Sequence, residues 1–272
     1  MNQAKLTRLN RLFAHPSGRF CSVAIDHFIG YQRGLPDGLT NLIQTLALVA
    51  AGTPDAVTMM KGPARTAWAP YAGRIPLIIS SVCFTADDAV MQSIARPSEA
   101  VLLGADAIAV AIGVRGPREG EYLKILATAV EEAEPFGLPV IAHVYPRDYS
   151  STAAIVHDPE NVMWAVRCGI ECGADVIKTP FTGDAVSFRQ IVATSPVPVV
   201  AAGGPKADSL EAALRLMLEV VASGARGATI GRNIWGASDP TRALLAFKAV
   251  IHDNATVKEA LRRAGLQVED AQ

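Results

Sequence analysis

The sequence has no excess of charge of either sign, few cysteines and no long apolar run. Its 25 basic and 26 acidic residues give a formal net charge of -1, so electrostatics provides no reason to expect nucleic acid or a membrane surface as a partner. No segment approaches the roughly 18 uninterrupted apolar residues of a membrane-spanning helix. The amino-terminal residues are polar and lack a signal-peptide core. We therefore expect a soluble, cytoplasmic protein.

The chain also lacks the usual metal-binding and redox motifs. The four cysteines form no CxxC pair, and the five histidines are scattered, with no HExxH motif. Cys168 and Cys172 lie four residues apart on a predicted helix, but no histidine of matching spacing is nearby. Buried thiols are the favoured interpretation. We predict neither a metal site nor a cofactor.

Short apolar runs alternate with segments of helical periodicity along the whole chain of 272 residues, of which 50% are hydrophobic. The runs are apolar on successive residues, which is typical of strands buried on both faces of a parallel sheet. The predicted strands are residues 20–26, 56–60, 76–82, 107–112, 139–145, 175–177, 197–202 and 228–230.

Helical segments follow most of these runs. A helix is predicted to begin at Asp158-Pro159, a capping residue followed by proline in the first turn. A loop containing Gly30, Gly34, Pro36 and Gly38 follows the first strand. The other predicted helices are residues 3–14, 39–51, 120–134, 209–223, 241–252 and 257–264.

Eight strand-helix units with short connections favour one closed (β/α)8 TIM barrel of about 250 residues over an open doubly wound sheet. No linker of distinct composition divides the chain. The fold prediction is therefore a single α/β domain covering residues 1–272, with an extra amino-terminal helix.

Lys178 stands at the end of an otherwise apolar strand, just before Thr179-Pro180. Desolvation disfavours an ammonium ion, so a lysine there would have a lowered pKa and could attack a ketone or aldehyde as a neutral amine. The alternative is a lysine that reaches the surface or pairs with a carboxylate.

Other polar residues also follow predicted strands, where barrel enzymes carry their reactive groups. Tyr145 and Asp26 are candidates for the proton transfers that Schiff-base chemistry requires. Asp26 could instead cap a loop, Tyr145 could be a wall residue, and His27 or His143 could be satisfied core histidines.

The ends of the last two predicted strands indicate an anion site. Gly203, Gly204 and Lys206 follow one strand, and Gly231 and Arg232 follow the next. Barrels often hold a phosphate in these two loops, where backbone N–H groups and positive charge converge. The glycines could also serve only as turns.

After the second predicted strand come Lys61 and Arg65. They could bind a second anionic group of the substrate, or they could form a solvated rim.

In Lys178, Tyr145 and the motifs at residues 203–206 and 231–233, the chain resembles the archaeal-type class I fructose-bisphosphate aldolases. That family also includes the 2-amino-3,7-dideoxy-D-threo-hept-6-ulosonate synthases and the autoinducer-2 phosphate thiolase. The likeness runs over about residues 20–248 and implies a (β/α)8 barrel. It also implies that Lys178 forms the Schiff base, that Tyr145 transfers protons and that Asp26 assists at the substrate hydroxyl.

The resemblance further implies that Gly203, Gly204, Gly231 and Arg232 hold a phosphate of a small-molecule substrate. It implies a homo-oligomer, either a ring or stacked rings. Three positions depart from the fructose-bisphosphate aldolase pattern: His143 replaces a tryptophan, Ala202 a serine and Phe28 a glycine. The substrate is therefore expected to be a phosphorylated ketose or a related sugar phosphate, not necessarily fructose 1,6-bisphosphate.

Two alternatives stay open beside a Schiff-base aldolase. The first is a transaldolase or an acyl-transferring thiolase of the same family, which would use the same lysine differently. The second is a sugar-phosphate isomerase or sensor without covalent chemistry, which would keep the two glycine loops and make Lys178 incidental.

Overall fold

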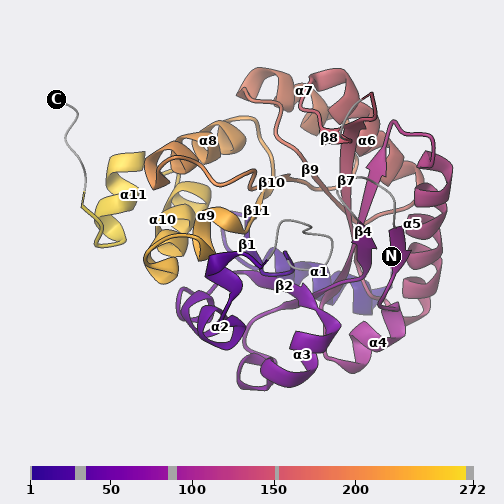
Figure 1. The fold of residues 1–272 in the computed structure, drawn as a ribbon, viewed down its shortest axis with the longest axis horizontal. Coiled ribbons are helices and arrows are strands. Elements are labelled where there is room, and N and C mark those ends of the chain that lie inside the picture. The colour runs from indigo at the N-terminus through magenta and orange to yellow at the C-terminus, as the bar shows by residue number, and fades with distance from the viewer. Residues whose placement is uncertain (1, 28–34, 85–90, 151–152, 268–272) are drawn as a thin grey trace.

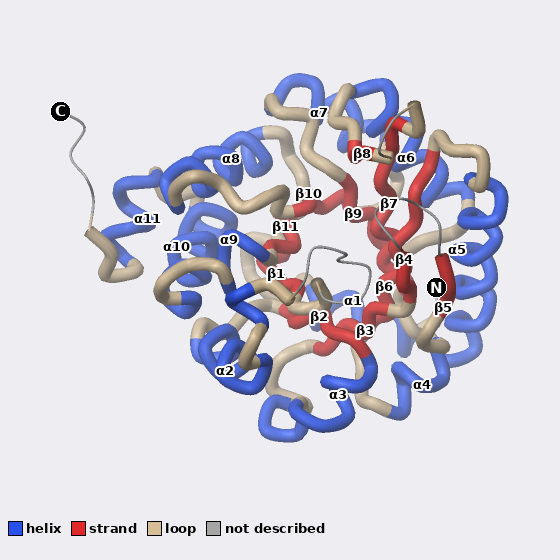
Figure 2. The backbone as a smooth tube through the Cα atoms, in the orientation of Figure 1, coloured by secondary structure: helices blue, strands red, loops and turns tan. Residues whose placement is uncertain are grey.

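The strands form a closed central ring and the helices form an outer layer around it (Figures 1 and 2). The structure is a computed structural model that describes residues 2–27, 35–84, 91–150 and 153–267. Phe28 and two residues of the predicted loop after the first strand, Gly30 and Gly34, lie outside the described residues. In the described part of the chain, no helix combines the length and the apolar character needed to cross a bilayer.

Eight parallel strands make up the ring, in the order β1-β2-β3-β6-β7-β9-β10-β11. Pairing of β6 with β7 and of β11 with β1 leaves none of these strands with an open edge. The (β/α)8 barrel prediction is confirmed. The ring strands are β1 Phe20–Ala24, β2 Ala56–Met60, β3 Leu77–Ser80, β6 Ala107–Val114, β7 Val140–Asp148, β9 Val176–Thr179, β10 Val199–Ala202 and β11 Gly227–Ile230.

Three short strands lie outside the ring. β4 (Val82–Phe84) pairs antiparallel with β5 (Met91–Ser93), and β8 (Ala154–Ile155) pairs antiparallel with the end of β7. The α-helices are α1 Gln3–Leu12, α2 Leu42–Ala51, α3 Lys61–Ala67, α4 Pro97–Leu102, α5 Glu119–Ala133, α6 Pro159–Glu171, α7 Ala185–Thr194, α8 Leu210–Ala222, α9 Arg232–Trp235, α10 Pro240–Asp253 and α11 Val257–Arg263. Single 3-10 turns cover Asp37–Leu39, Ala69–Tyr71 and Glu134–Phe136.

Most predicted elements are confirmed, with corrections at their ends. α6 starts as predicted, because the Asp158 side chain accepts a hydrogen bond from the Asn161 N–H and Pro159 occupies the first turn. The predicted helix from residue 39 begins only at Leu42, since Asp37–Leu39 forms a 3-10 turn. The predicted strand 76–82 was too long, because Val82 already pairs with β5. Helices α3, α4 and α7 were not predicted from the sequence.

The barrel interior is apolar at the amino-terminal end of its strands. Phe20, Ile78, Ile141 and Val176 form one buried cluster there, together with Leu12 of α1. Leu12 is fully buried, and burying such a side chain contributes roughly 1.5–3 kcal/mol. The extra amino-terminal helix therefore closes this end of the barrel, which leaves the carboxyl ends of the strands as its mouth.

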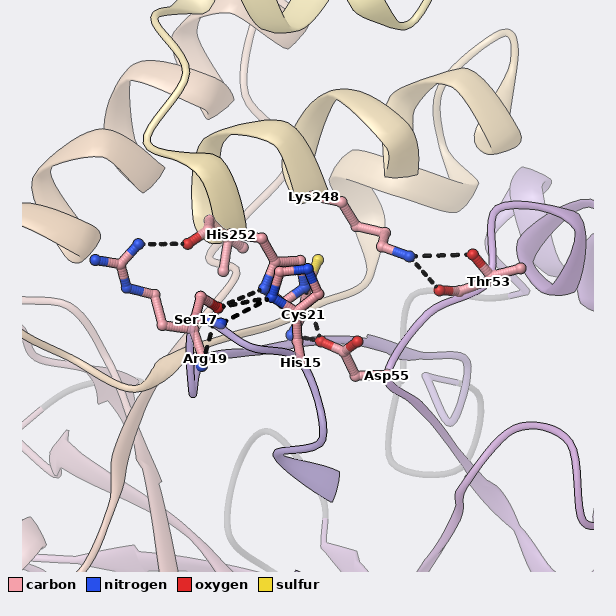
Figure 3. A network of polar contacts seen from close by, with 9 residues as sticks. His15, Ser17, Arg19, Cys21, Thr53, Asp55, Lys248 and His252 are labelled. Carbon is pink, nitrogen blue, oxygen red and sulfur yellow. Dashed lines mark hydrogen bonds and ion pairs between the residues drawn. The ribbon is translucent and has the colours of Figure 1, made fainter. Parts of the chain in front are cut away.

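A buried polar network joins the segment before β1 to α10, as Figure 3 shows. The His252 ring lies between Ser17 and Asp55, with Nδ1 3.0 Å from Ser17 Oγ and Nε2 3.0 Å from Asp55 Oδ2. His15 stacks on His252 at a centroid distance of 3.8 Å. Asp55 Oδ2 also accepts the backbone N–H of Cys21 at 2.6 Å, so the network fixes the start of β1.

Removing the imidazole from this network is expected to destabilise the barrel without touching its mouth. In His252→Ala, Asp55 loses a buried partner, and an uncompensated buried polar group costs about 1–3 kcal/mol. Urea denaturation followed by circular dichroism measures the change in unfolding free energy. Lys124→Ala, on the exposed face of α5, is the control and should change stability by less than about 0.5 kcal/mol. Equal stabilities for His252→Ala and wild type would contradict a structural role for the network.

Candidate active site

Lys178 lies on β9 and faces the barrel interior. In register it stands beside His143 of β7 and Val200 of β10. Val176, two residues earlier on the same strand face, and Val200 both belong to the interior cluster. The side chain is buried, with the residue 6% exposed. The predicted place of Lys178 at the end of a strand is confirmed, because β9 ends one residue later at Thr179.

The neighbouring strand β7 presents three polar side chains to the same interior. His143, Tyr145 and Arg147 alternate along the strand, so they share one face. His143 and Arg147 are buried, with 4% and 6% exposure, and Tyr145 is half-buried. β7 continues to Asp148, three residues beyond the predicted end. This extension carries Arg147 over the barrel mouth on a strand instead of on a loop.

Gly113 makes room for Arg147. It stands opposite Tyr145 in the β6–β7 register. A Cβ atom at this position would lie 3.2 Å from Arg147 Cδ and 3.0 Å from Tyr149 Oη. A side chain at position 113 would therefore displace Arg147 and Tyr149 from the part of β6 that they cover.

Asp26 and His27 follow β1 at the same end of the barrel. His27 Nδ1 lies 3.4 Å from Asp26 Oδ1, and the two side chains are 20% and 16% exposed. The His27 ring packs edge-on against the Trp235 indole, with centroids 5.5 Å apart and planes at 66°. It also lies directly on Gly231, where a Cβ would stand 2.5 Å from His27 Cε1. Gly231 therefore gives space to His27, in addition to any contact with a ligand.

Both histidines are neutral near pH 7. Burial lowers the pKa of His27 to about 4 despite the opposing effect of Asp26, and the charges of Lys178 and Arg232 lower it further. Burial also lowers the pKa of His143 well below its usual value, with added contributions from Lys178 and His27. These mutual effects place His27, His143 and Lys178 within electrostatic reach of one another, although they come from three different strand ends.

The two glycine loops lie against each other. Gly204 has φ of +70°, a backbone conformation that favours glycine, and an added Cβ there would meet only open space. Arg232 Nη2 donates to the Gly204 carbonyl at 2.9 Å. Asn233 donates to the carbonyls of Gly203 and Pro205 at 3.0 and 2.9 Å. The Lys206 side chain approaches Gly236, just after α9. Residues 203–206 and 231–233 thus form one unit, called the glycine cradle below.

Lys61 and Arg65 lie on α3, which begins directly after β2. Lys61 Nζ pairs with both carboxylate oxygens of Glu99 at 2.8 and 3.0 Å, and Lys61 lowers the pKa of Glu99 through this hydrogen bond. Arg65 is exposed. To bind an anionic ligand, Lys61 would have to break its ion pair with Glu99. The sequence does not indicate this ion pair.

Three residues of the site were not among the sequence candidates. Arg147 could have been found, because it continues the two-residue alternation of His143 and Tyr145. Asn233 was visible only as part of a short motif, and its role as a link between two loops depends on the tertiary structure. Trp235 gave no sequence signal for its contact with His27, which lies far away in the chain.

Comparison with known proteins gives consistent matches over nearly the whole chain. A protein-family profile described as DeoC/LacD family aldolase matches residues 20–237. The 2-amino-3,7-dideoxy-D-threo-hept-6-ulosonate synthase of Halobacterium salinarum is 33% identical over 97% of this chain and 98% of its own length. The 2-amino-4,5-dihydroxy-6-oxo-7-(phosphonooxy)heptanoate synthase of Streptomyces griseus is 28% identical over 96% of this chain and 95% of its own length.

Among solved structures, an archaeal fructose 1,6-bisphosphate aldolase superimposes with a TM-score of 0.81 at 28% identity. The match covers 92% of this chain and 99% of the other. A second aldolase structure, with its catalytic lysine covalently bound to the carbinolamine intermediate of the substrate, has a TM-score of 0.80 at 28% identity, covering 91% and 99% of the two chains.

The lowered pKa values of the two histidines predict a loss of stability in acid. Between pH 6.5 and about 4 the unfolded chain protonates His27 while the folded chain does not. The unfolding free energy should therefore fall as the pH falls through this window. Urea denaturation at pH 7 and pH 5 measures the slope, which should be shallower in His27→Gln than in wild type. Identical slopes would show that His27 titrates normally in the folded protein.

Proposed function

The chain belongs to the DeoC/LacD aldolase family, and from this premise we propose that Lys178 is the Schiff-base lysine of a class I aldolase reaction on a phosphorylated ketose or a related sugar phosphate. The observation that carries the proposal is the burial of this lysine inside the barrel, beside His143 of β7, the strand that also carries Tyr145. The solved aldolase with its catalytic lysine bound to a carbinolamine supports it, at 28% identity and a TM-score of 0.80.

In the proposed reaction the Lys178 nitrogen attacks the substrate carbonyl carbon to form a carbinolamine. Loss of water then gives an iminium ion. The β-hydroxyl then gives its proton to a base, and the bond between the α- and β-carbons breaks. Its electron pair moves toward the iminium nitrogen, so an enamine and an aldehyde result. Protonation of the enamine and hydrolysis return the lysine. The protonated nitrogen supplies the electron sink that this cleavage requires.

Two groups at the barrel mouth fit the proton transfers. Tyr145 is two residues from His143 on the same face of β7, and its phenol can donate a proton to the departing carbinolamine hydroxyl. Asp26 can accept the proton of the substrate hydroxyl whose carbon becomes the aldehyde. The neutral state of His27 and His143 avoids two further positive charges beside Lys178. A protonated histidine there would raise the barrier to iminium formation.

The glycine cradle is the proposed phosphate site. Gly204 leaves open space where a ligand could approach the backbone, whereas Gly203 and Gly231 pack against Ile230 and His27 and keep the two loops together. Arg232 and Lys206 add positive charge. Asn233 ties the two loops together through three hydrogen bonds, so the cradle is pre-formed. A phosphate held there would fix the distance between one end of the substrate and Lys178. Such positioning contributes to rate by limiting the motion of the reacting atoms.

The identity of the carbon acceptor is a second part of the proposal. Both sequence relatives are named as synthases of seven-carbon amino sugar acids, and His143 alters the wall beside Lys178. Transfer of the enamine carbon to an acceptor, as in a transaldolase, is therefore the alternative outcome of the same chemistry. Lys61 and Arg65 would contact a second anionic group, with Glu99 released from Lys61. His27 would act as a wall of the site.

The proposal extends to the organisation of the protein. We propose that residues 1–272 act as a single domain and that the chain forms a homo-oligomer, a ring or stacked rings. A cytoplasmic location stays a prediction from the sequence.

Borohydride reduction in the presence of candidate ketose phosphates tests the central step. We expect a covalent adduct whose mass is that of protein plus ligand, less one water and plus two hydrogens, with peptide mapping placing the label on Lys178. Lys178→Ala should form no adduct. The matched control is Lys124→Ala, a lysine on the exposed surface of α5, which should label as well as wild type. An unlabelled Lys178 under saturating ligand would favour the isomerase or sensor alternative.

Separating the nucleophile from the proton-transfer groups gives a further test. Tyr145→Phe and Asp26→Asn should retain borohydride trapping to a reduced extent, because Lys178 is intact, while kcat falls about 10²- to 10⁴-fold. Release of aldehyde, coupled to a dehydrogenase, measures kcat. Wild-type turnover in both variants would remove Tyr145 and Asp26 from the mechanism while leaving Lys178 in place.

A further inference from the structure

Trp235 lies where the glycine cradle meets the end of β1. It is the last residue of α9, whose first residue Arg232 belongs to the cradle. The indole is buried, with the residue 6% exposed. Its Nε1–H donates to the carbonyl of Ala24 at 3.0 Å, although the two residues are 211 positions apart. Ala24 is the last residue of β1, two positions before Asp26.

His27 also interacts with Ala24. The backbone of Ala24 forms a hydrogen bond with the His27 ring, and the ring packs edge-on against Trp235. On its other side His27 lies on Gly231, the cap of α9. His27 is thus enclosed between a residue of the cradle and the indole, and its Nδ1 lies 3.4 Å from Asp26. A movement of α9 would be transmitted to Asp26 through these contacts.

The far side of Trp235 is fixed as well. A Cβ on Gly38 would lie 2.1 Å from the Trp235 carbonyl oxygen and 2.7 Å from Cε3. Gly38 is itself held by Thr45, whose Oγ1 donates to the Gly38 carbonyl at 2.6 Å. Trp235 therefore has two packed neighbours, His27 and Gly38, and one directed hydrogen bond.

From these contacts we propose that Trp235 is a positioning residue that couples occupancy of the glycine cradle to the placement of Asp26 and His27. The proposal rests on the proposed function, because Asp26 matters only if it transfers a proton. An anion drawn to Gly204 and Arg232 restrains α9, and the indole and His27 pass this restraint to the end of β1. A substrate would then organise the proton-transfer group by binding its phosphate at a distance from the reacting carbon.

The coupling can be observed without any catalytic turnover. In the full-length protein, inorganic phosphate serves as the probe, and the Cε1–H resonance of His27 is followed by NMR. The signal is assigned by its absence in His27→Gln. We expect the wild-type resonance to shift with the same midpoint as phosphate binding measured by calorimetry. Trp235→Phe keeps an aromatic ring but loses the donor to Ala24; it should bind phosphate within about threefold of wild type and lose at least half of the His27 shift.

Trp164→Phe is the matched control. Trp164 is 43% exposed on α6, and its Nε1 donates to Glu119 of α5 at 3.2 Å. This variant should show the wild-type shift. With a ketose phosphate that borohydride traps on Lys178, Trp235→Phe should retain trapping, while kcat falls about tenfold and KM changes less than threefold.

The possible results separate this proposal from the proposed function. An unchanged His27 shift in Trp235→Phe overturns the coupling, as does phosphate that binds wild type without moving His27 or that does not bind at all. If Trp235→Phe does not fold, a wild-type titration in which phosphate binds without moving His27 still overturns the coupling. Failure of wild type to trap any ketose phosphate contradicts the Schiff-base function and leaves the NMR result to be judged independently.

Discussion

Closing eight parallel strands into a ring is the constraint on which the rest of this molecule depends. Every strand alternates its side chains between the helices outside and one shared interior. The interior is sealed at one end by α1 and by apolar residues such as Phe20 and Ile141. Within the ring, the ionisable side chains Lys178, His143 and Arg147 therefore lie toward the other end. The site is polar and enclosed because the ring leaves only one mouth where such groups can be placed.

Enclosure also determines the charge state of the site. His27 and His143 lie near Lys178, and burial holds both imidazoles neutral at pH 7. The two imidazoles beside Lys178 therefore add no positive charge to the site at pH 7. Lys61, outside the ring on α3, is instead paired with a carboxylate. Lysines therefore differ in environment according to whether they face the interior or the rim.

The candidate active site is assembled from opposite ends of the chain. Trp235 bonds to Ala24, and Asn233 links the loops after β10 and β11. These contacts arise because β11 pairs with β1 when the ring closes. The closure brings the glycine cradle beside Asp26. The proposed phosphate site and the proposed proton-transfer group are thereby joined through a few buried side chains, in a way that an open sheet would not allow.

Local pattern was enough to predict the strands, the fold class and most of the polar strand ends. The apolar run before Lys178 and the cap at Asp158 are examples, because burial on two faces and helix capping act over a few neighbouring residues. Short elements such as α3 escaped prediction, since seven residues carry little periodic signal.

The sequence by itself determined that this chain forms a barrel and which residues follow its strands. Only the tertiary structure decided how those residues are used. It placed Lys178 inside β9, gave Lys61 to Glu99, set Arg147 over Gly113 and packed His27 between Gly231 and Trp235. The physical reason is that each of these contacts joins residues far apart in the chain. Their distances are defined only after the ring has closed and the side chains have filled it.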